Sequence, residues 1–136
     1  MEYEFDFNNE TMFFMAPNQV MQITAPANAA RPSGWMLMVH PEYIWNTSLA
    51  NIIRQYDFFD YFVNEALFLS EDEAYNMHLL FQNIQLEYES TIDPFSQGIV
   101  ISQIETLLNY SQRYYQRQFI TRRKANHTIL GKMKQF

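Results

Sequence analysis

Three histidines, His40, His78 and His127, are the residues of this chain best suited to proton transfer or metal binding, and the chain has no cysteine. Imidazole changes charge near neutral pH and is a common metal ligand. No histidine is followed by a second one at the spacing of a helical metal motif, and no histidine–carboxylate cluster has metal-ligand spacing. We therefore expect no metal and no cofactor. Without cysteine the chain also has no thiol nucleophile and no disulfide.

Other catalytic signatures are missing from the sequence. There is no G-x-S-x-G nucleophile motif, and three glycines in total are too few for a glycine-rich phosphate loop. The acidic triplet Glu71, Asp72 and Glu73 follows Ser70, which is the pattern of a helix N-terminus and not of paired catalytic carboxylates. We predict that the chain is not an enzyme.

The charges of the chain are strongly asymmetric. Of 136 residues, 15 are acidic and nine are basic, for a net charge of -6. All the acidic residues lie at or before Glu105, and seven basic residues lie between Arg113 and Lys134. An acidic body repels phosphate backbones. The basic end is either a DNA contact or, as we favour, a solvated helix end or a partner for the chain's own acidic surface.

No apolar run reaches the roughly 18 residues of a membrane span. The first residues, Met-Glu-Tyr-Glu-Phe, are acidic, unlike a secretory signal. We therefore expect a cytoplasmic protein that makes no membrane contact.

The first forty residues have the pattern of short β-strands. Residues 2–7 alternate aromatic and acidic side chains with period two, which is typical of a half-buried strand. Apolar or extended runs follow at 11–15, 19–24 and 35–39, with Pro- and Asn-rich breaks between them. Sequential strands joined by turns favour antiparallel pairing.

The remaining residues predict helices. Thr47 or Ser48 can cap a short helix to about Tyr56, and Ser70 with Glu73 forms a capping box for a helix to about Ser90. Asp93 and Pro94 begin a longer helix that we expect to reach residue 122, about 29 residues and about 43 Å. A last short helix is expected over 128–135, although Gly131 weakens it.

Three stretches of the sequence resemble the regulatory part of AraC/XylS-family transcription regulators, particularly the Bacteroidetes type. They are GWMLMVHPEYIWNTSLA at 34–50, IIRQYDFFDYFVNEALFLSEDE at 52–73 and ESTIDPFSQGIVISQIETLLNYSQRYYQRQFITRRKANHTIL at 89–130. They contain, in order, the motifs N-E-A-L-x-L-S-E, I-E-x-L-L-N-Y, R-x-Y and R-Q-F-I-T-R. The resemblance covers about two thirds of the chain. MFFMAPNQV at 12–20 resembles the late strands of that family's barrel more loosely.

The resemblance implies an α+β fold, with a partial cupin-like antiparallel β-barrel of about four strands followed by a helical dimerisation and linker bundle. The boundaries we expect are 1–45 for the β region and 46–136 for the helical region. In that family two helix-turn-helix motifs follow the helical region, and this chain ends before them. We therefore expect the chain to be a regulatory fragment that senses an effector and dimerises, with DNA binding only through a helix-turn-helix domain missing from this chain.

Two other functions remain open at this stage. One is a stand-alone small-molecule-binding protein with a partial cupin, and the other is a cupin enzyme, for which the single histidine near the strands is too little metal ligation. The candidate ligand-binding residues are Phe14, Trp35 and His40, because pockets are mostly apolar and aromatic. The plainer alternatives are a core position for each aromatic side chain and a backbone hydrogen bond for the histidine.

The candidate dimer interface lies on the long predicted helix. Its apolar residues Ile101, Ile104, Leu108 and Tyr115 recur near heptad spacing, as in helices that pair with a partner. The same stripe can instead pack within its own chain. We predict a homodimer, because the resembled family dimerises through its linker helices and the helix is longer than a small domain needs.

Overall fold

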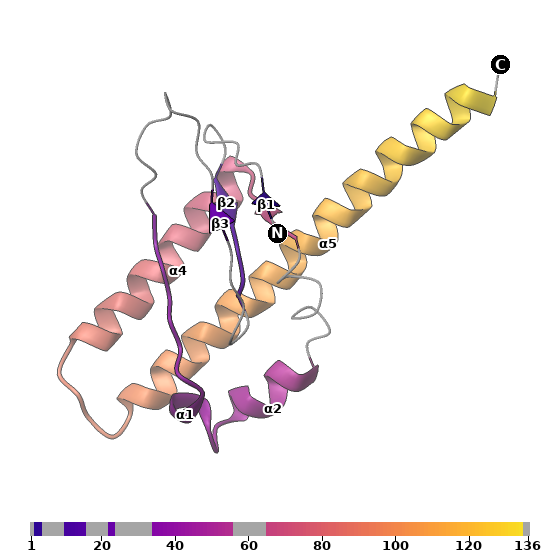
Figure 1. Ribbon diagram of the computed structural model, residues 1–136. Helices are drawn as coiled ribbons and strands as arrows, with labels where there is room; N and C mark the ends of the chain where they lie inside the picture. The colour runs from indigo at the N-terminus through magenta and orange to yellow at the C-terminus, as the bar shows by residue number, and fades with distance from the viewer. Residues whose placement is uncertain (1, 4–9, 16–21, 24–33, 56–64, 135–136) are drawn as a thin grey trace.

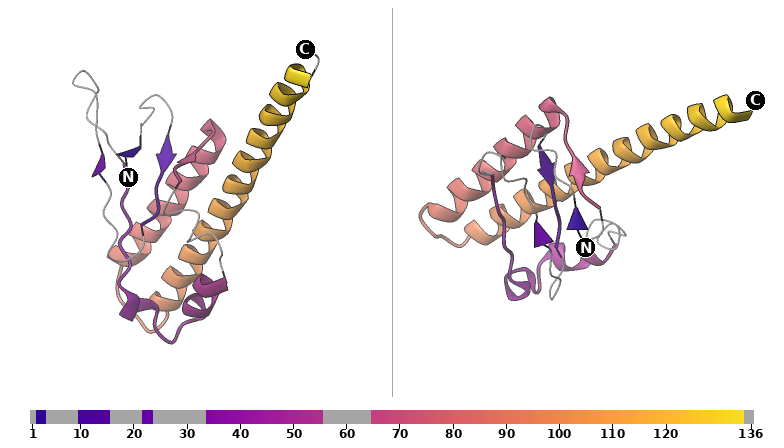
Figure 2. Two further views of the ribbon diagram at one scale, coloured as in Figure 1. Left: turned by 45° about the vertical axis from the view of Figure 1, so that its right-hand side comes forward. Right: turned by 45° about the horizontal axis from the view of Figure 1, so that its top comes forward.

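The computed structural model describes residues 2–3, 10–15, 22–23, 34–55 and 65–134. Two long helices dominate this part of the chain: α4 (Glu71–Glu89) and α5 (Ser96–Lys134). They lie side by side and run in opposite directions, and the C-terminal part of α5 continues well past the N-terminus of α4 (Figure 1, Figure 2). The shorter elements are β1 (Glu2–Tyr3), β2 (Thr11–Met12), β3 (Gln22–Ile23), α1 (Pro41–Ile44), α2 (Ser48–Gln55) and β4 (Leu67–Phe68).

Helix α4 begins where its capping box predicts. The Ser70 hydroxyl accepts a hydrogen bond from the backbone N–H of Glu73, and the Glu73 carboxylate accepts one from the backbone N–H of Ser70. These contacts satisfy two backbone donors that the first turn leaves without helical partners. Three acidic side chains in that turn complement the helix dipole.

Helix α5 is longer than the sequence suggests. A turn at 94–95 precedes it, and the Asp93 carboxylate accepts hydrogen bonds from the Phe95 N–H and the Ser96 hydroxyl. From Ser96 the helix runs without interruption to Lys134, so the separate short helix expected over 128–135 is part of α5. No proline follows Pro94, and a single glycine in a helix costs only about 1 kcal/mol.

The core is formed mainly by the facing sides of α4 and α5. From α4 it takes Ala74, Met77 and Ile84, and Leu49, Leu67 and Leu69 close it from the shorter segments. The contribution of α5 is a continuous stripe at helical spacing: Val100, Ile101, Ile104, Leu107, Leu108, Tyr114 and Tyr115.

The expected partial cupin-like barrel of about four antiparallel strands is wrong. Within the described residues the strands form two separate two-stranded pairs and no barrel. β1 pairs with β3 in parallel, and β2 pairs antiparallel with β4, which lies far along the chain (Thr11 opposite Phe68). The described part of the protein is therefore mostly helical.

The physical reason for the error is that alternation predicts an extended backbone, whereas a sheet also needs a partner for each edge. Residues 35–39 are extended but belong to no strand, since no ladder forms along them. The predicted strand at 2–7 is described only at Glu2 and Tyr3, and that at 19–24 only at Gln22 and Ile23. The rest of both lies outside the described residues.

No helix in the described part of the chain combines the length and the apolar character that crossing a bilayer requires.

The burial of α5 predicts a sharp contrast between two isoleucines. Ile104 is 5% exposed in the core, whereas Ile92, in the turn between α4 and α5, is 86% exposed. Ile104→Ala should lower the free energy of unfolding by about 2–5 kcal/mol, because it removes buried methylenes and leaves a cavity. Ile92→Ala is the matched control and should change it by less than about 0.5 kcal/mol. Urea unfolding measures both; equal losses would contradict the packing described here.

Candidate functional site

The three predicted ligand-binding residues contact different elements. Phe14 packs against Tyr115 of α5, with ring centroids 6.2 Å apart. Trp35 stacks on Phe81 of α4, also at 6.2 Å. His40 is the N-cap of α1, and its Nδ1 accepts a hydrogen bond from the backbone N–H of Glu42. Phe14 and Trp35 thus reach the two long helices, whereas His40 has a local capping role.

The four predicted interface residues lie inside the single chain. Ile101, Ile104, Leu108 and Tyr115 are each at most 5% exposed and belong to the core between α4 and α5. In this arrangement none of them is at the surface. The homodimer itself stays a prediction, and it requires other residues.

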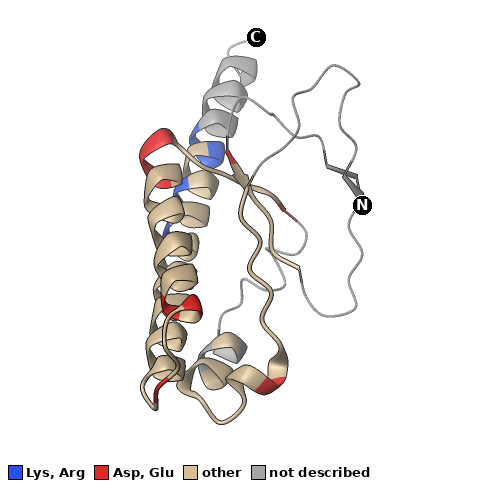
Figure 3. Ribbon diagram, turned by 90° about the vertical axis from the view of Figure 1, so that its left-hand side faces the viewer, with Lys and Arg blue, Asp and Glu red and all other residues tan. Residues whose placement is uncertain are grey.

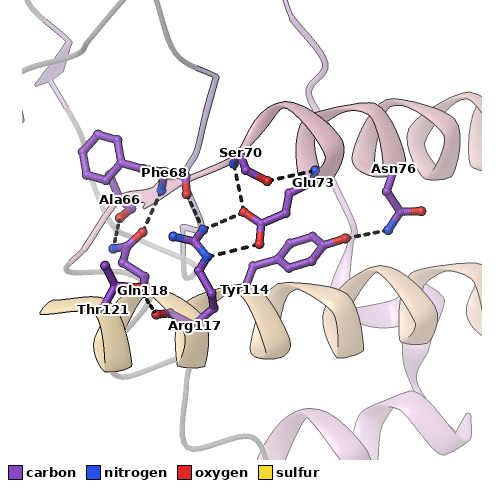
Figure 4. Close-up of polar contacts among 9 residues, drawn as sticks. All are labelled: Ala66, Phe68, Ser70, Glu73, Asn76, Tyr114, Arg117, Gln118 and Thr121. Carbon is purple, nitrogen blue, oxygen red and sulfur yellow. Dashed lines mark hydrogen bonds and ion pairs between the residues drawn. The ribbon is translucent and has the colours of Figure 1, made fainter. Parts of the chain in front are cut away.

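The densest group of polar contacts lies where α5 leaves the body, at the start of α4 and beside β4 (Figure 4). Arg117 of α5 binds both carboxylate oxygens of Glu73, at 2.6 Å and 3.2 Å, and donates a further hydrogen bond of 2.7 Å to the carbonyl of Phe68. The Glu73 side chain is 14% exposed and that of Arg117 40%. A two-point guanidinium–carboxylate contact fixes orientation as well as distance. We call this group of residues, 65–73 with 114–122, the junction.

The side-chain amide of Gln118 makes the hydrogen bonds to β4 that a neighbouring strand would otherwise make. Its Oε1 accepts a hydrogen bond of 2.9 Å from the Phe68 N–H, and its Nε2 donates one of 3.1 Å to the Ala66 carbonyl. The other edge of β4 pairs with β2, where the Leu69 N–H also donates to the Glu10 carbonyl. Gln118 is 7% exposed, so its amide satisfies backbone groups that lie away from water.

Further contacts extend the junction in both directions. The Tyr115 hydroxyl donates a 2.6 Å hydrogen bond to the Glu65 carbonyl, and Arg122 pairs with the Glu65 carboxylate. On the other side, the Asn76 amide donates to the Tyr114 hydroxyl at 2.7 Å. Segment 65–70 is thereby attached to α5 over about two helical turns.

Chemically, the junction holds its elements in register, and the carboxylates of Glu65 and Glu73 are each paired with an arginine. In the described residues no group of three or more histidines and carboxylates is arranged to hold a metal ion. Elsewhere, burial and, to a smaller extent, the nearby Tyr88 raise the pKa of Tyr43. The junction thus ties β4 and the first turn of α4 to α5.

Sequence reasoning missed Arg117 and Gln118 as functional candidates, although a signal was present. Gln118 follows Ser111 and Tyr115 on the α5 stripe, so it is a second polar residue on a mostly apolar face. A buried amide at such a position needs partners for both its oxygen and its nitrogen.

Comparisons of the chain with known protein families, with curated proteins and with solved structures give no match.

The double hydrogen bond of Gln118 predicts a measurable stability loss. Gln118→Ala leaves the Phe68 N–H and the Ala66 carbonyl without these partners, and we expect a loss of about 1–3 kcal/mol in the free energy of unfolding. Gln116→Ala, two positions earlier on the exposed side of α5, serves as the control and should be nearly neutral. Chemical denaturation followed by circular dichroism compares the two; a neutral Gln118→Ala would mean that β4 does not depend on this amide.

Proposed function

We propose that this chain is the effector-sensing and dimerising part of a transcription regulator of the AraC/XylS type, and that it is not itself a sequence-specific DNA binder. The observation that carries the proposal is that two of the resembling motifs, distant in sequence, meet at the junction. Residues from Glu65 to Ser70 belong to N-E-A-L-x-L-S-E, and Arg117 to Arg122 form R-Q-F-I-T-R. Their contacts through Arg117 and Gln118 give both motifs one structural role.

The proposed route from effector to output runs along the two long helices. Phe14 and Trp35, the candidate effector contacts, rest on Tyr115 of α5 and Phe81 of α4. A small molecule that displaces either aromatic side chain shifts a helix of the core pair. The junction then passes that shift to the part of α5 that extends beyond the body (Figure 1).

The surface available for dimerisation lies on the side of α4 that faces away from α5. Tyr75, Leu79 and Leu86 are 68%, 40% and 69% exposed, and their spacing places them on one helical face with Gln82. An amphipathic surface helix normally has one apolar side, whereas α4 has two. We assign the outer one to a second copy of the chain.

Charge complementarity favours the end of the partner's α5 as the element that covers this face. α4 carries five acidic residues and no lysine or arginine. The end of α5, residues 122–134, carries five of the chain's nine basic residues and no acidic one. Figure 3 shows acidic residues at the start of α4 beside basic residues of α5, and further acidic residues near the other end of α4. Pairing α4 with a second α4 would therefore bring like charges together.

The dimer proposal predicts that the full chain self-associates at tens of micromolar and that Leu79→Glu with Leu86→Glu yields a folded monomer. Both side chains are exposed in the single chain, so the substitutions should leave the helix content intact while placing two charges in the dimer contact. Sedimentation velocity and circular dichroism test this together. A native monomer, or a double variant that still dimerises, would refute the assignment.

A charge exchange tests which element covers α4. Arg123→Glu with Lys124→Glu should weaken self-association, and adding Glu71→Lys with Asp72→Lys should restore it. If the first pair of substitutions has no effect, α4 pairs with some other surface of the second copy.

The same charges predict the DNA behaviour. Any binding of duplex DNA by the chain should be weak, independent of sequence and steeply reduced by salt, because it would rest on a few arginine and lysine contacts with phosphates. Arg123→Gln with Lys124→Gln should lower the slope of log affinity against log salt by about one to two. Fluorescence anisotropy on unrelated duplexes measures both; salt-resistant, sequence-selective binding would contradict the proposal.

A further inference from the structure

The extended segment Gly34–His40 passes α4 with few polar contacts to hold it. Residues 36–39 make no backbone hydrogen bond with the described part of the chain. Met36 and Met38 are each 85% exposed, and Leu37 and Val39 are more than a third exposed. The placement of this segment therefore depends on its two ends, where His40 caps α1 and Trp35 contacts α4.

Trp35 is attached to α4 in two ways. Its ring stacks on Phe81 with an interplanar angle of 17°, and its indole N–H donates a hydrogen bond of 2.9 Å to Nδ1 of His78. His78 and Phe81 are three residues apart, so they present neighbouring side chains on one face of the helix. The imidazole in turn contacts Glu10, whose carboxylate oxygen lies 2.5 Å from Nε2.

The hydrogen bond from Trp35 requires one tautomer of the His78 ring. The indole N–H of tryptophan is a donor only, so Nδ1 of His78 must accept and carries no proton. The single ring proton then resides on Nε2, where it is donated to the Glu10 carboxylate. Trp35 is consequently held by the neutral imidazole, in one of its two tautomers.

We propose that Glu10, His78 and Trp35 form a proton-operated latch for the segment Gly34–His40. A proton added to His78 must go to Nδ1, where it meets the indole N–H and ends the hydrogen bond to Trp35. The contact between His78 and Glu10 persists and becomes a pair of opposite charges, because the imidazole is now positive. Acidification thus removes the hydrogen bond between Trp35 and His78, which holds the segment, and leaves the pair of His78 with Glu10, which does not involve the segment. The latch does not depend on the proposed regulatory function.

The titratable groups around the imidazole are few in the described residues. The segment that carries β2 contributes Glu10, and α4 contributes Tyr75 one turn before His78. Segment 34–40 contributes no charged side chain beside Trp35; its own titratable residue, His40, is at the far end and accepts from the Glu42 N–H. Protonation of His40 is therefore a separate event that needs its own control.

The test follows the indole N–H of Trp35 by nuclear magnetic resonance in the full chain. Trp45→Phe removes the second indole, that of a residue which is 69% exposed, and leaves one cross-peak. Between about pH 8 and pH 5, where imidazole gains its charge, this cross-peak should shift in one step and exchange faster with water. His78→Gln in the same background should abolish the step, because glutamine accepts and donates like the neutral imidazole but does not titrate.

His40→Gln is the matched control and should leave the step unchanged. The proposal is overturned if the Trp45→Phe protein shows no step in this range, or if the step survives His78→Gln. Should His78→Gln fail to fold, His78→Asn supplies a second variant without a titrating side chain. The step should again be lost, and its survival would equally overturn the latch.

Discussion

Glu73 has two sets of partners, and the arrangement of α4, β4 and α5 depends on its serving both at once. Its carboxylate accepts from the Ser70 N–H, which starts α4, and from Arg117, which ties α4 to α5. The same guanidinium reaches the Phe68 carbonyl on β4. Because the carboxylate is largely removed from solvent, an opposite charge and several donors are needed to offset its lost hydration. The start of α4, the strand β4 and the contact between α4 and α5 are thus connected through Glu73 and its partner Arg117.

The parts of this fold that sequence reasoning predicted are those determined by neighbouring residues. Ser70 and Glu73 are three positions apart, so the capping box and the start of α4 were predicted correctly, as was α2 from Ser48. The end of α5 was not predicted correctly. The helix continues past residue 122 and through Gly131 to Lys134, although basic residues and glycine are common near helix ends.

The barrel failed for the opposite reason, since it depends on pairing between distant segments. The run Thr11–Met15 was predicted as a strand, but only Thr11–Met12 forms one, and its partner Leu67–Phe68 was not considered. The junction is also non-local: Gln118 reads as one polar residue on an apolar stripe until β4 is placed beside it. The apolar stripe of α5 was predicted, yet its spacing alone does not distinguish a core from an interface. All four residues that were predicted to form a dimer interface are buried within the single chain.

The uninterrupted length of α5 has a mechanical consequence. Beyond Gln118 the helix continues for 16 residues, or about 24 Å at 1.5 Å per residue. A helix transmits rotation as a stiff rod, so a tilt of about 10° at Arg117 would move its far end by about 4 Å. The gain of such a lever is set by the distance between pivot and tip. A glycine pair inserted just after Arg122 would reduce that gain without removing any contact of the junction.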